Sequence, residues 1–110
     1  PGGCSDGDIS KALAHLEGTY VLRVFAEFEA ALRTIYQRIR KRAAMPRVKV
    51  SLLIDWLSRN SMPDNVRKDA HRVREYRNSL AHEGGSEVPI SMSQCRSILC
   101  TYLSFVPRVP

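Results

Sequence analysis

Three residues near position 80 have side chains suited to chemistry on a phosphate. Arg77 and Asn78 are neighbours, and His82 follows five residues after the arginine, beside the Gly84-Gly85 pair. An imidazole at an exposed helix end titrates near neutral pH and can exchange protons with a substrate. A guanidinium presents a planar fork of donors that suits phosphate or carboxylate oxygens. A histidine in the last helical turn often has only a structural role beside the free carbonyl groups, and for His82 taken alone this alternative is favoured.

These residues lie in one stretch with helical periodicity, from residue 64 to about residue 82. At about 100° per residue, one stripe of this helix is polar and carries His71, Glu75, Asn78 and His82, with Arg74 at its edge. Arg77 lies instead near the margin of the opposite, apolar arc. A desolvated guanidinium without a partner is costly, so Arg77 needs a carboxylate or a phosphate. Glu27 is a candidate partner if the helix that carries it packs against this one.

The segments that must position these residues also have the periodicity of helices. A first helical segment begins near residue 5 and extends to about residue 14, and a long apolar stripe follows it. The stripe recurs at three- and four-residue steps and consists of Leu13, Leu16, Tyr20, Val24, Phe28, Ala31, Leu32, Ile35 and Ile39. Gly18 interrupts this run, so we expect either two helices or one bent helix. Pro46 blocks its continuation.

Three further helices are predicted after this run, over residues 48–59, 64–82 and 91–106, each within a few residues. The alternating residues 47–50 resemble a strand, but a lone strand has nothing to pair with. The sequence therefore predicts an all-α fold, a four- to five-helix up-and-down bundle whose short connections favour antiparallel neighbours. The 110 residues fit a single domain, and we expect residues 1–8 to form a flexible N-terminal segment.

The charge of the chain indicates a phosphate-bearing partner. Lys and Arg number 17 against 11 Asp and Glu, which gives a net charge of +6, and arginine supplies 13 of the 17 cations. A basic cluster at the end of the long apolar run consists of Arg38, Arg40, Lys41 and Arg42. Cations at a helix C-terminus complement its dipole, and such clusters are more often solvated helix faces than binding sites.

Composition argues against several classes of protein. A hydrophobic fraction of 44% and a charged fraction of 25% are ordinary for a globular domain. No apolar run approaches the roughly 18 residues that a membrane span needs, and no secretory signal is visible. The cysteines are odd in number, and the spacing of Cys95 and Cys100 fits no common zinc site. We therefore expect a cytoplasmic protein with no cofactor, no metal and no membrane contact.

The segment Arg77-Asn78-Ser79-Leu80-Ala81-His82 resembles the hallmark of HEPN domains. That family is all-helical, and it carries Arg, four to six residues and then His near the end of the penultimate long helix. Residues 28–33 on the early long helix, and one closing helix after the motif, follow the order found in the family. The resemblance covers about residues 20–103.

The resemblance implies a metal-independent endoribonuclease that forms a homodimer and brings two such motifs into one cleft. In that scheme a ribose 2′-hydroxyl attacks the adjacent phosphate. His82 would be the general acid/base, Arg77 would stabilise the transition-state charge, and Asn78 would orient the phosphate or the imidazole. Arg74 and the basic cluster would hold the RNA backbone by salt-sensitive contacts.

Two other functions stay open. The first is a noncatalytic HEPN-like module that dimerises or binds nucleotides, RNA or a partner protein. Such a module would belong to a larger protein or to a toxin–antitoxin or defence system, and Arg77 would form a buried structural ion pair. The second is a generic RNA binder that uses the basic cluster and does not need His82. Subfamilies with a nucleotidyltransferase-like antitoxin often have a tyrosine shortly after the histidine, whereas Glu83-Gly84-Gly85 follow here, so that particular pairing is not expected.

Overall fold

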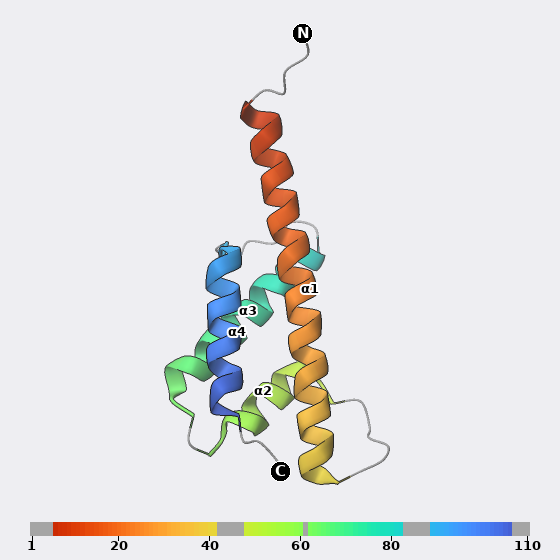
Figure 1. The fold of residues 1–110 in the computed structure, drawn as a ribbon, viewed down its shortest axis with the longest axis vertical. Coiled ribbons are helices and arrows are strands. Elements are labelled where there is room, and N and C mark those ends of the chain that lie inside the picture. The colour runs from red at the N-terminus through yellow and green to blue at the C-terminus, as the bar shows by residue number, and fades with distance from the viewer. Residues whose placement is uncertain (1–5, 42–47, 61, 83–88, 107–110) are drawn as a thin grey trace.

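The structure, a computed structural model, describes residues 6–41, 48–60, 62–82 and 89–106. Within these ranges the chain forms four helices and no strand: α1 (Asp6–Arg40), α2 (Val50–Ser58), α3 (Asp64–Ala81) and α4 (Met92–Phe105) (Figure 1). The prediction of an all-α bundle is confirmed. The flexible segment expected over residues 1–8 overlaps the first turn of α1, and its first five residues lie outside the described part.

Helix α1 runs without a break through Gly18, so the two-helix alternative is wrong. Glycine in a helix interior costs about 1 kcal/mol relative to alanine, which is too little by itself to divide a helix of 35 residues. The neighbour at this point is Leu80 of α3, whose Cδ2 atom would lie 3.7 Å from a Cβ built on Gly18. This is an ordinary van der Waals distance, so close packing does not require the glycine.

The hydrophobic core lies where the second half of α1 meets the other three helices. Each helix contributes buried apolar side chains, among them Phe25, Phe28 and Leu32 from α1, Leu53 and Ile54 from α2, Ala70 and Val73 from α3, and Leu99 and Tyr102 from α4. The ring of Phe28 contacts those of Phe25 and Tyr102, with centroid distances of 5.6 and 5.4 Å. Such aromatic contacts add about 0.5–1.5 kcal/mol each beyond the buried area.

The apolar stripe predicted along α1 is divided between the core and the surface. Val21, Phe25 and Phe28 are buried, but Leu13 and Leu16 are exposed. The first turns of α1 extend beyond the other helices, as Figure 1 shows. The molecule is therefore elongated, with principal extents of 61 × 29 × 26 Å.

A buried hydrogen bond joins α4 to α2. The hydroxyl of Tyr102 donates to the backbone oxygen of Ile54 over 2.7 Å, and this tyrosine is fully buried. At its start, α4 has a capping box, in which the Ser91 hydroxyl accepts from the Gln94 backbone and the Gln94 side chain accepts from the Ser91 backbone. The hydrogen bond ties α4 to α2, and the capping box stabilises the first turn of α4.

Candidate functional site

A groove of about 440 Å³ opens between α1, the start of α2 and the second half of α3. We call it the arginine groove. Four cations and one carboxylate line it, together with one side-chain amide: Arg33, Lys49, Arg74, Arg77, Glu29 and Asn78. This excess of positive charge in a concave site favours an anionic ligand.

Arg33 fixes the wall of the arginine groove that leads into α2. Its Nε and Nη2 atoms donate to Glu29 Oε2 over 3.1 and 2.9 Å, and its Nη1 atom donates to the backbone oxygen of Val48 over 2.6 Å. The glutamate and the arginine are one helical turn apart on α1, which is the spacing of a helical ion pair. Arg33 therefore ties the chain before α2 to α1, and its own charge is largely matched.

The start of α2 adds a second source of positive potential. The N-cap residue is Lys49, it makes no side-chain cap, and no acidic residue lies in the first turn. The backbone oxygen of Lys49 accepts from the N–H groups of Leu52 and Leu53. Val50 and Ser51, the first two residues of the helix, line the groove. The N–H groups at a helix start carry partial positive charge and attract anions.

Arg77 is half-buried in the groove wall, as its place at the margin of the apolar arc predicts. Its Nη1 atom donates to Asn78 Oδ1 over 2.9 Å, and its Cζ atom lies 5.5 Å from the ring centroid of Phe25. The Nε atom is buried and has no hydrogen-bond partner among the described residues. Leaving a buried donor unpaired costs about 1–3 kcal/mol, so an incoming oxyanion would relieve an existing penalty.

The carboxylate proposed from the sequence as the partner of Arg77 is not beside it. Helices α1 and α3 do pack together, as that idea required, but Glu27 is exposed and forms no ion pair with Arg77. The carboxylate that lines the groove is Glu29, two positions further on and therefore on a different side of α1. Glu29 is already committed to Arg33. Among the residues that the structure describes, Arg77 thus faces the groove without a carboxylate of its own.

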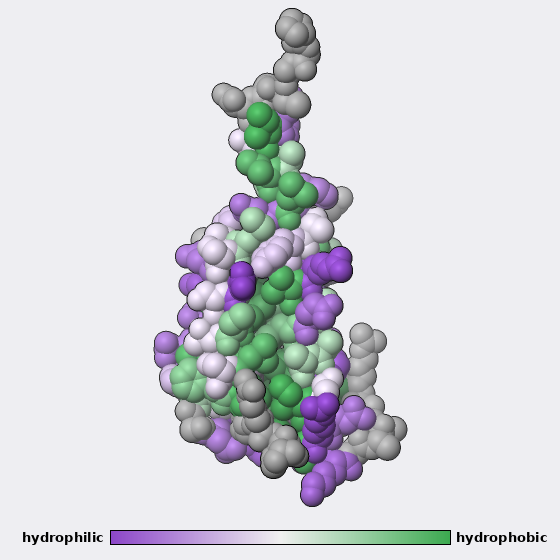
Figure 2. Space-filling model, in the orientation of Figure 1, coloured by the Kyte–Doolittle hydropathy of each residue, from purple (hydrophilic) through white to green (hydrophobic). Residues whose placement is uncertain are grey.

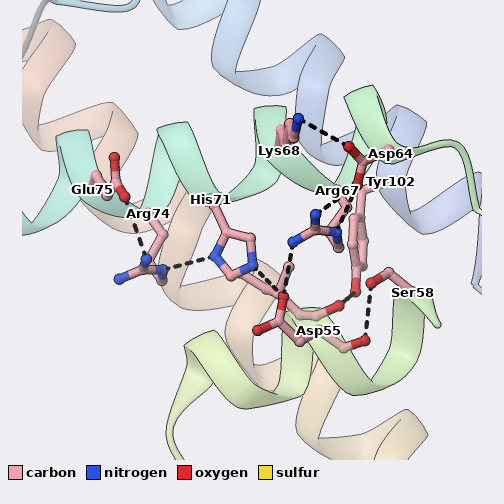
Figure 3. Close-up of polar contacts among 10 residues, drawn as sticks. Asp55, Ser58, Asp64, Arg67, Lys68, His71, Arg74, Glu75 and Tyr102 are labelled. Atoms are coloured by element: carbon pink, nitrogen blue, oxygen red, sulfur yellow. Dashed lines mark hydrogen bonds and ion pairs between the residues drawn. The ribbon is translucent and has the colours of Figure 1, made fainter.

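Arg74 is oriented by a chain of polar contacts that begins on α2 (Figure 3). Its Nε atom lies 3.2 Å from His71 Nδ1, and His71 Nε2 lies 2.7 Å from Asp55 Oδ1. The carboxylate accepts, so we assign the imidazole proton to Nε2, which leaves Nδ1 to accept from the arginine. Glu75 Oε1, 3.6 Å from Arg74 Nη2, adds a weaker contact. The relay places Arg74 in the groove lining.

Asp55 is the anchor of this relay. Burial opposes its ionisation, but the hydrogen bonds from His71 and Arg67, together with the positive charge of Arg67, outweigh that effect and lower its pKa. Arg67 is shared, because its guanidinium also contacts Asp64 over 2.6 Å. Asp55 is not among the site residues predicted from the sequence. The spacing of Arg67, His71 and Arg74, each one turn apart, was the signal that a polar line on α3 needs a carboxylate on a neighbouring helix.

His82 lies outside the arginine groove. It is the exposed residue directly after α3, where the backbone is extended and its N–H donates to the Ser79 oxygen over 3.4 Å. Five helical steps separate it from Arg77, which turns the two side chains about 140° apart around the helix axis. Asn78 connects the two positions, because it contacts Arg77 and precedes His82 by four residues, about 40° around the helix.

The structure brings Arg74, Arg77 and Asn78 together, whereas the basic cluster is elsewhere. Arg38, Arg40 and Lys41 are exposed at the C-terminal end of α1 and do not line the groove. The Arg40 guanidinium lies 6.0 Å from the ring centroid of Tyr36. Arg42 lies outside the described residues. The basic cluster therefore adds positive charge at the end of α1, but none of its described residues lines the arginine groove.

Comparison of the chain with protein-family models, with curated proteins and with solved structures finds no match in any of the three. In the described part of the chain, no helix has both the length and the apolar character that a bilayer crossing demands. The same residues include no group of three or more His, Cys, Asp or Glu side chains placed to hold a metal ion.

Proposed function

We propose that this domain binds RNA through phosphate contacts in the arginine groove and cleaves it without a metal, as its resemblance to HEPN domains implies. The observation that carries the proposal is the convergence of Arg74, Arg77 and Asn78 on one concave, basic site. The buried Nε atom of Arg77 supports it, because this donor has no acceptor in the described part of the chain and a phosphate oxygen could supply one.

The proposed reaction needs one proton carrier and one cation. His82 removes the proton from a ribose 2′-hydroxyl, the O2′–P bond forms, and the P–O5′ bond breaks. His82 then returns that proton to the departing 5′-oxygen, which leaves a 2′,3′-cyclic phosphate and a 5′-hydroxyl. Arg77 stabilises the negative charge on the non-bridging oxygens, and Asn78 holds the phosphate between the two. A strand that leaves the groove across Asn78 runs toward His82.

The test is cleavage of a labelled single-stranded RNA by the full chain in excess EDTA. We expect products that end in 2′,3′-cyclic phosphate. His82→Ala should abolish cleavage but keep RNA affinity, whereas Arg77→Ala should weaken both, because only the arginine lies in the groove. Cleavage that needs an added divalent metal, or that survives in His82→Ala, would contradict the catalytic assignment.

The position of His82 outside the groove favours a second candidate, a noncatalytic RNA-binding module. In that case the wild-type chain binds RNA with the same dependence on Arg74 and Arg77 and turns over none of it. Binding that depends on Arg38 and Arg40 but not on Arg77 would instead indicate a generic basic surface.

A further inference from the structure

An aromatic pair, Tyr36 and Trp56, lies between α1 and α2 outside the arginine groove. The two ring centroids are 4.8 Å apart, and the ring planes meet at 84°. Both rings pack at the edge of the hydrophobic core, and both side chains stay half-buried. Because the core holds each ring on one side, the part that remains exposed is a fixed aromatic surface. The reaction proposed above does not use this pair.

Two arginines flank the aromatic pair. The Cζ atom of Arg59 lies 4.4 Å from the ring centroid of Trp56, and that of Arg40 lies 6.0 Å from the ring centroid of Tyr36. Both arginines are exposed, and neither has an ion pair with any residue that the structure describes. Hydrophilic side chains gather at this end of α1 (Figure 2). The two guanidinium groups lie against rings and not against carboxylates, so their charge is available to an anion.

The aromatic pair continues the arginine groove along α1. Arg33 lines the groove, and Tyr36 and Arg40 follow it at steps of three and four residues. At about 100° per residue, these steps keep the three side chains within about 60° around the helix. The order from the groove to the end of α1 is therefore cation, aromatic ring, cation.

Helix α2 repeats this order. Its N-cap residue, Lys49, lines the groove, and Trp56 follows seven residues later, about 20° around the helix and about 10 Å along it. Arg59 follows one turn further. The two lines lie side by side, because Arg33 Nη1 donates to the backbone oxygen of Val48 over 2.6 Å and the two rings meet beyond that contact. A strand that leaves the groove between α1 and α2 therefore passes the aromatic pair.

We propose that the aromatic pair and its two arginines form a stacking site for an unpaired base of the RNA. The proposal rests on the RNA binding proposed above, but not on cleavage by His82. A cation–π contact at an exposed site is weaker than the stacking of a base on an aromatic side chain. A base therefore replaces the Arg59 guanidinium on the Trp56 ring and releases it to the neighbouring phosphate. The bases of a double helix are stacked on one another, so this site selects single-stranded RNA.

The fluorescence of Trp56 tests the proposal directly, because the chain has one tryptophan. The full chain is titrated with a short single-stranded RNA, with a duplex of the same sequence, and with inorganic polyphosphate, which carries the charge without the bases. We expect the single strand to quench the emission to a saturating level and the duplex to quench it less. Polyphosphate should compete with the RNA but leave the emission largely unchanged. Quenching by polyphosphate as strong as that by RNA would overturn the proposal.

Substitutions test which side chains the base needs, with affinity measured by the anisotropy of a labelled single-stranded RNA. Tyr36→Leu and Trp56→Leu keep an apolar side chain against the core and remove one ring, so each should weaken binding about tenfold. Trp56→Phe should restore most of the affinity. Tyr20→Leu is the matched control, because Tyr20 is a half-buried tyrosine of α1 that lines a different groove, beside α4, and its replacement should change nothing. Circular dichroism checks that each variant remains helical.

Arg59→Gln changes only an exposed side chain, so it tests the site without disturbing the core. It should lower the slope of log affinity against log salt by about one, since it removes one phosphate contact. Binding that depends on Arg77 while the ring variants and the Trp56 emission show no effect would overturn the stacking site and leave the proposed RNA binding intact. A wild-type chain that binds no RNA would overturn both.

Discussion

The environment of Arg77 is unusual because its guanidinium is only partly matched. One nitrogen donates to Asn78, the group lies against the Phe25 ring, and the Nε atom is buried without an acceptor among the described residues. An arginine kept for stability would be expected to have a carboxylate beside it. The arrangement is suited instead to a ligand that brings its own oxygen atoms, such as a phosphodiester.

Replacement of Arg77 by methionine separates a role in the stability of the fold from a role in ligand binding. Methionine keeps an apolar stem against Phe25 and removes the unpaired donor. We therefore expect the free energy of unfolding in urea to change by less than about 1 kcal/mol, while RNA affinity falls at least about tenfold. Arg96→Met, at an exposed position on α4, is the control for a general loss of charge. A loss of several kcal/mol in Arg77→Met would show that Arg77 is a structural ion-pair residue.

At the scale of the elements, a substitution at Gly18 tests whether α1 needs a glycine where it packs against α3. A Cβ at this position meets only the Leu80 side chain at ordinary contact distance. Gly18→Ala should therefore raise the free energy of unfolding by about 0.5–1 kcal/mol, because alanine loses less conformational entropy in a helix. Urea titration measures this change. A decrease in stability would mean that the approach of α3 to α1 is tighter than the structure shows.

The contact of α4 with α2 predicts a dependence of stability on alkaline pH. Burial raises the pKa of Tyr102, while in the unfolded chain the phenol titrates near its ordinary value of about 10. Above about pH 10 the unfolded chain loses this proton and the folded chain keeps it, so the free energy of unfolding falls as pH rises. Tyr102→Phe should cost about 0.5–1.5 kcal/mol at neutral pH and should reduce the alkaline loss. Urea titrations of the wild type and of Tyr102→Phe from pH 7 to about pH 11 give the slope of the free energy of unfolding against pH for each. Equal slopes would contradict the raised pKa of Tyr102.

At the scale of the whole molecule, the net charge of +6 and the concentration of cations in one groove predict salt-sensitive binding. RNA affinity should fall steeply with salt, because bound cations release counterions from the RNA. Lys49→Ala should lower the slope of log affinity against log salt by about one, since Lys49 lines the groove and contributes one charge. Lys68→Ala, which removes an exposed lysine paired with Asp64 outside the groove, should leave the slope unchanged. Fluorescence anisotropy over a salt series measures both.

Local sequence patterns were sufficient to predict the helices. The apolar periodicity and the Pro and Gly residues placed the last three helices to within two residues at each end. They also placed Arg77 at the edge of the buried face, where it is half-buried. These features depend on interactions within about one helical turn, so they are encoded by neighbouring residues.

The partners of each helix were decided only by tertiary packing. Periodicity shows that a face is apolar but not what covers it, so Leu13 and Leu16 were grouped with Phe28 although they are exposed. In the same way, Glu29 rather than Glu27 lines the groove, and Asp55 on α2 anchors His71 on α3. Such contacts join residues from different helices, and their geometry depends on how the helices cross and rotate about their axes. No spacing along one chain segment specifies that rotation.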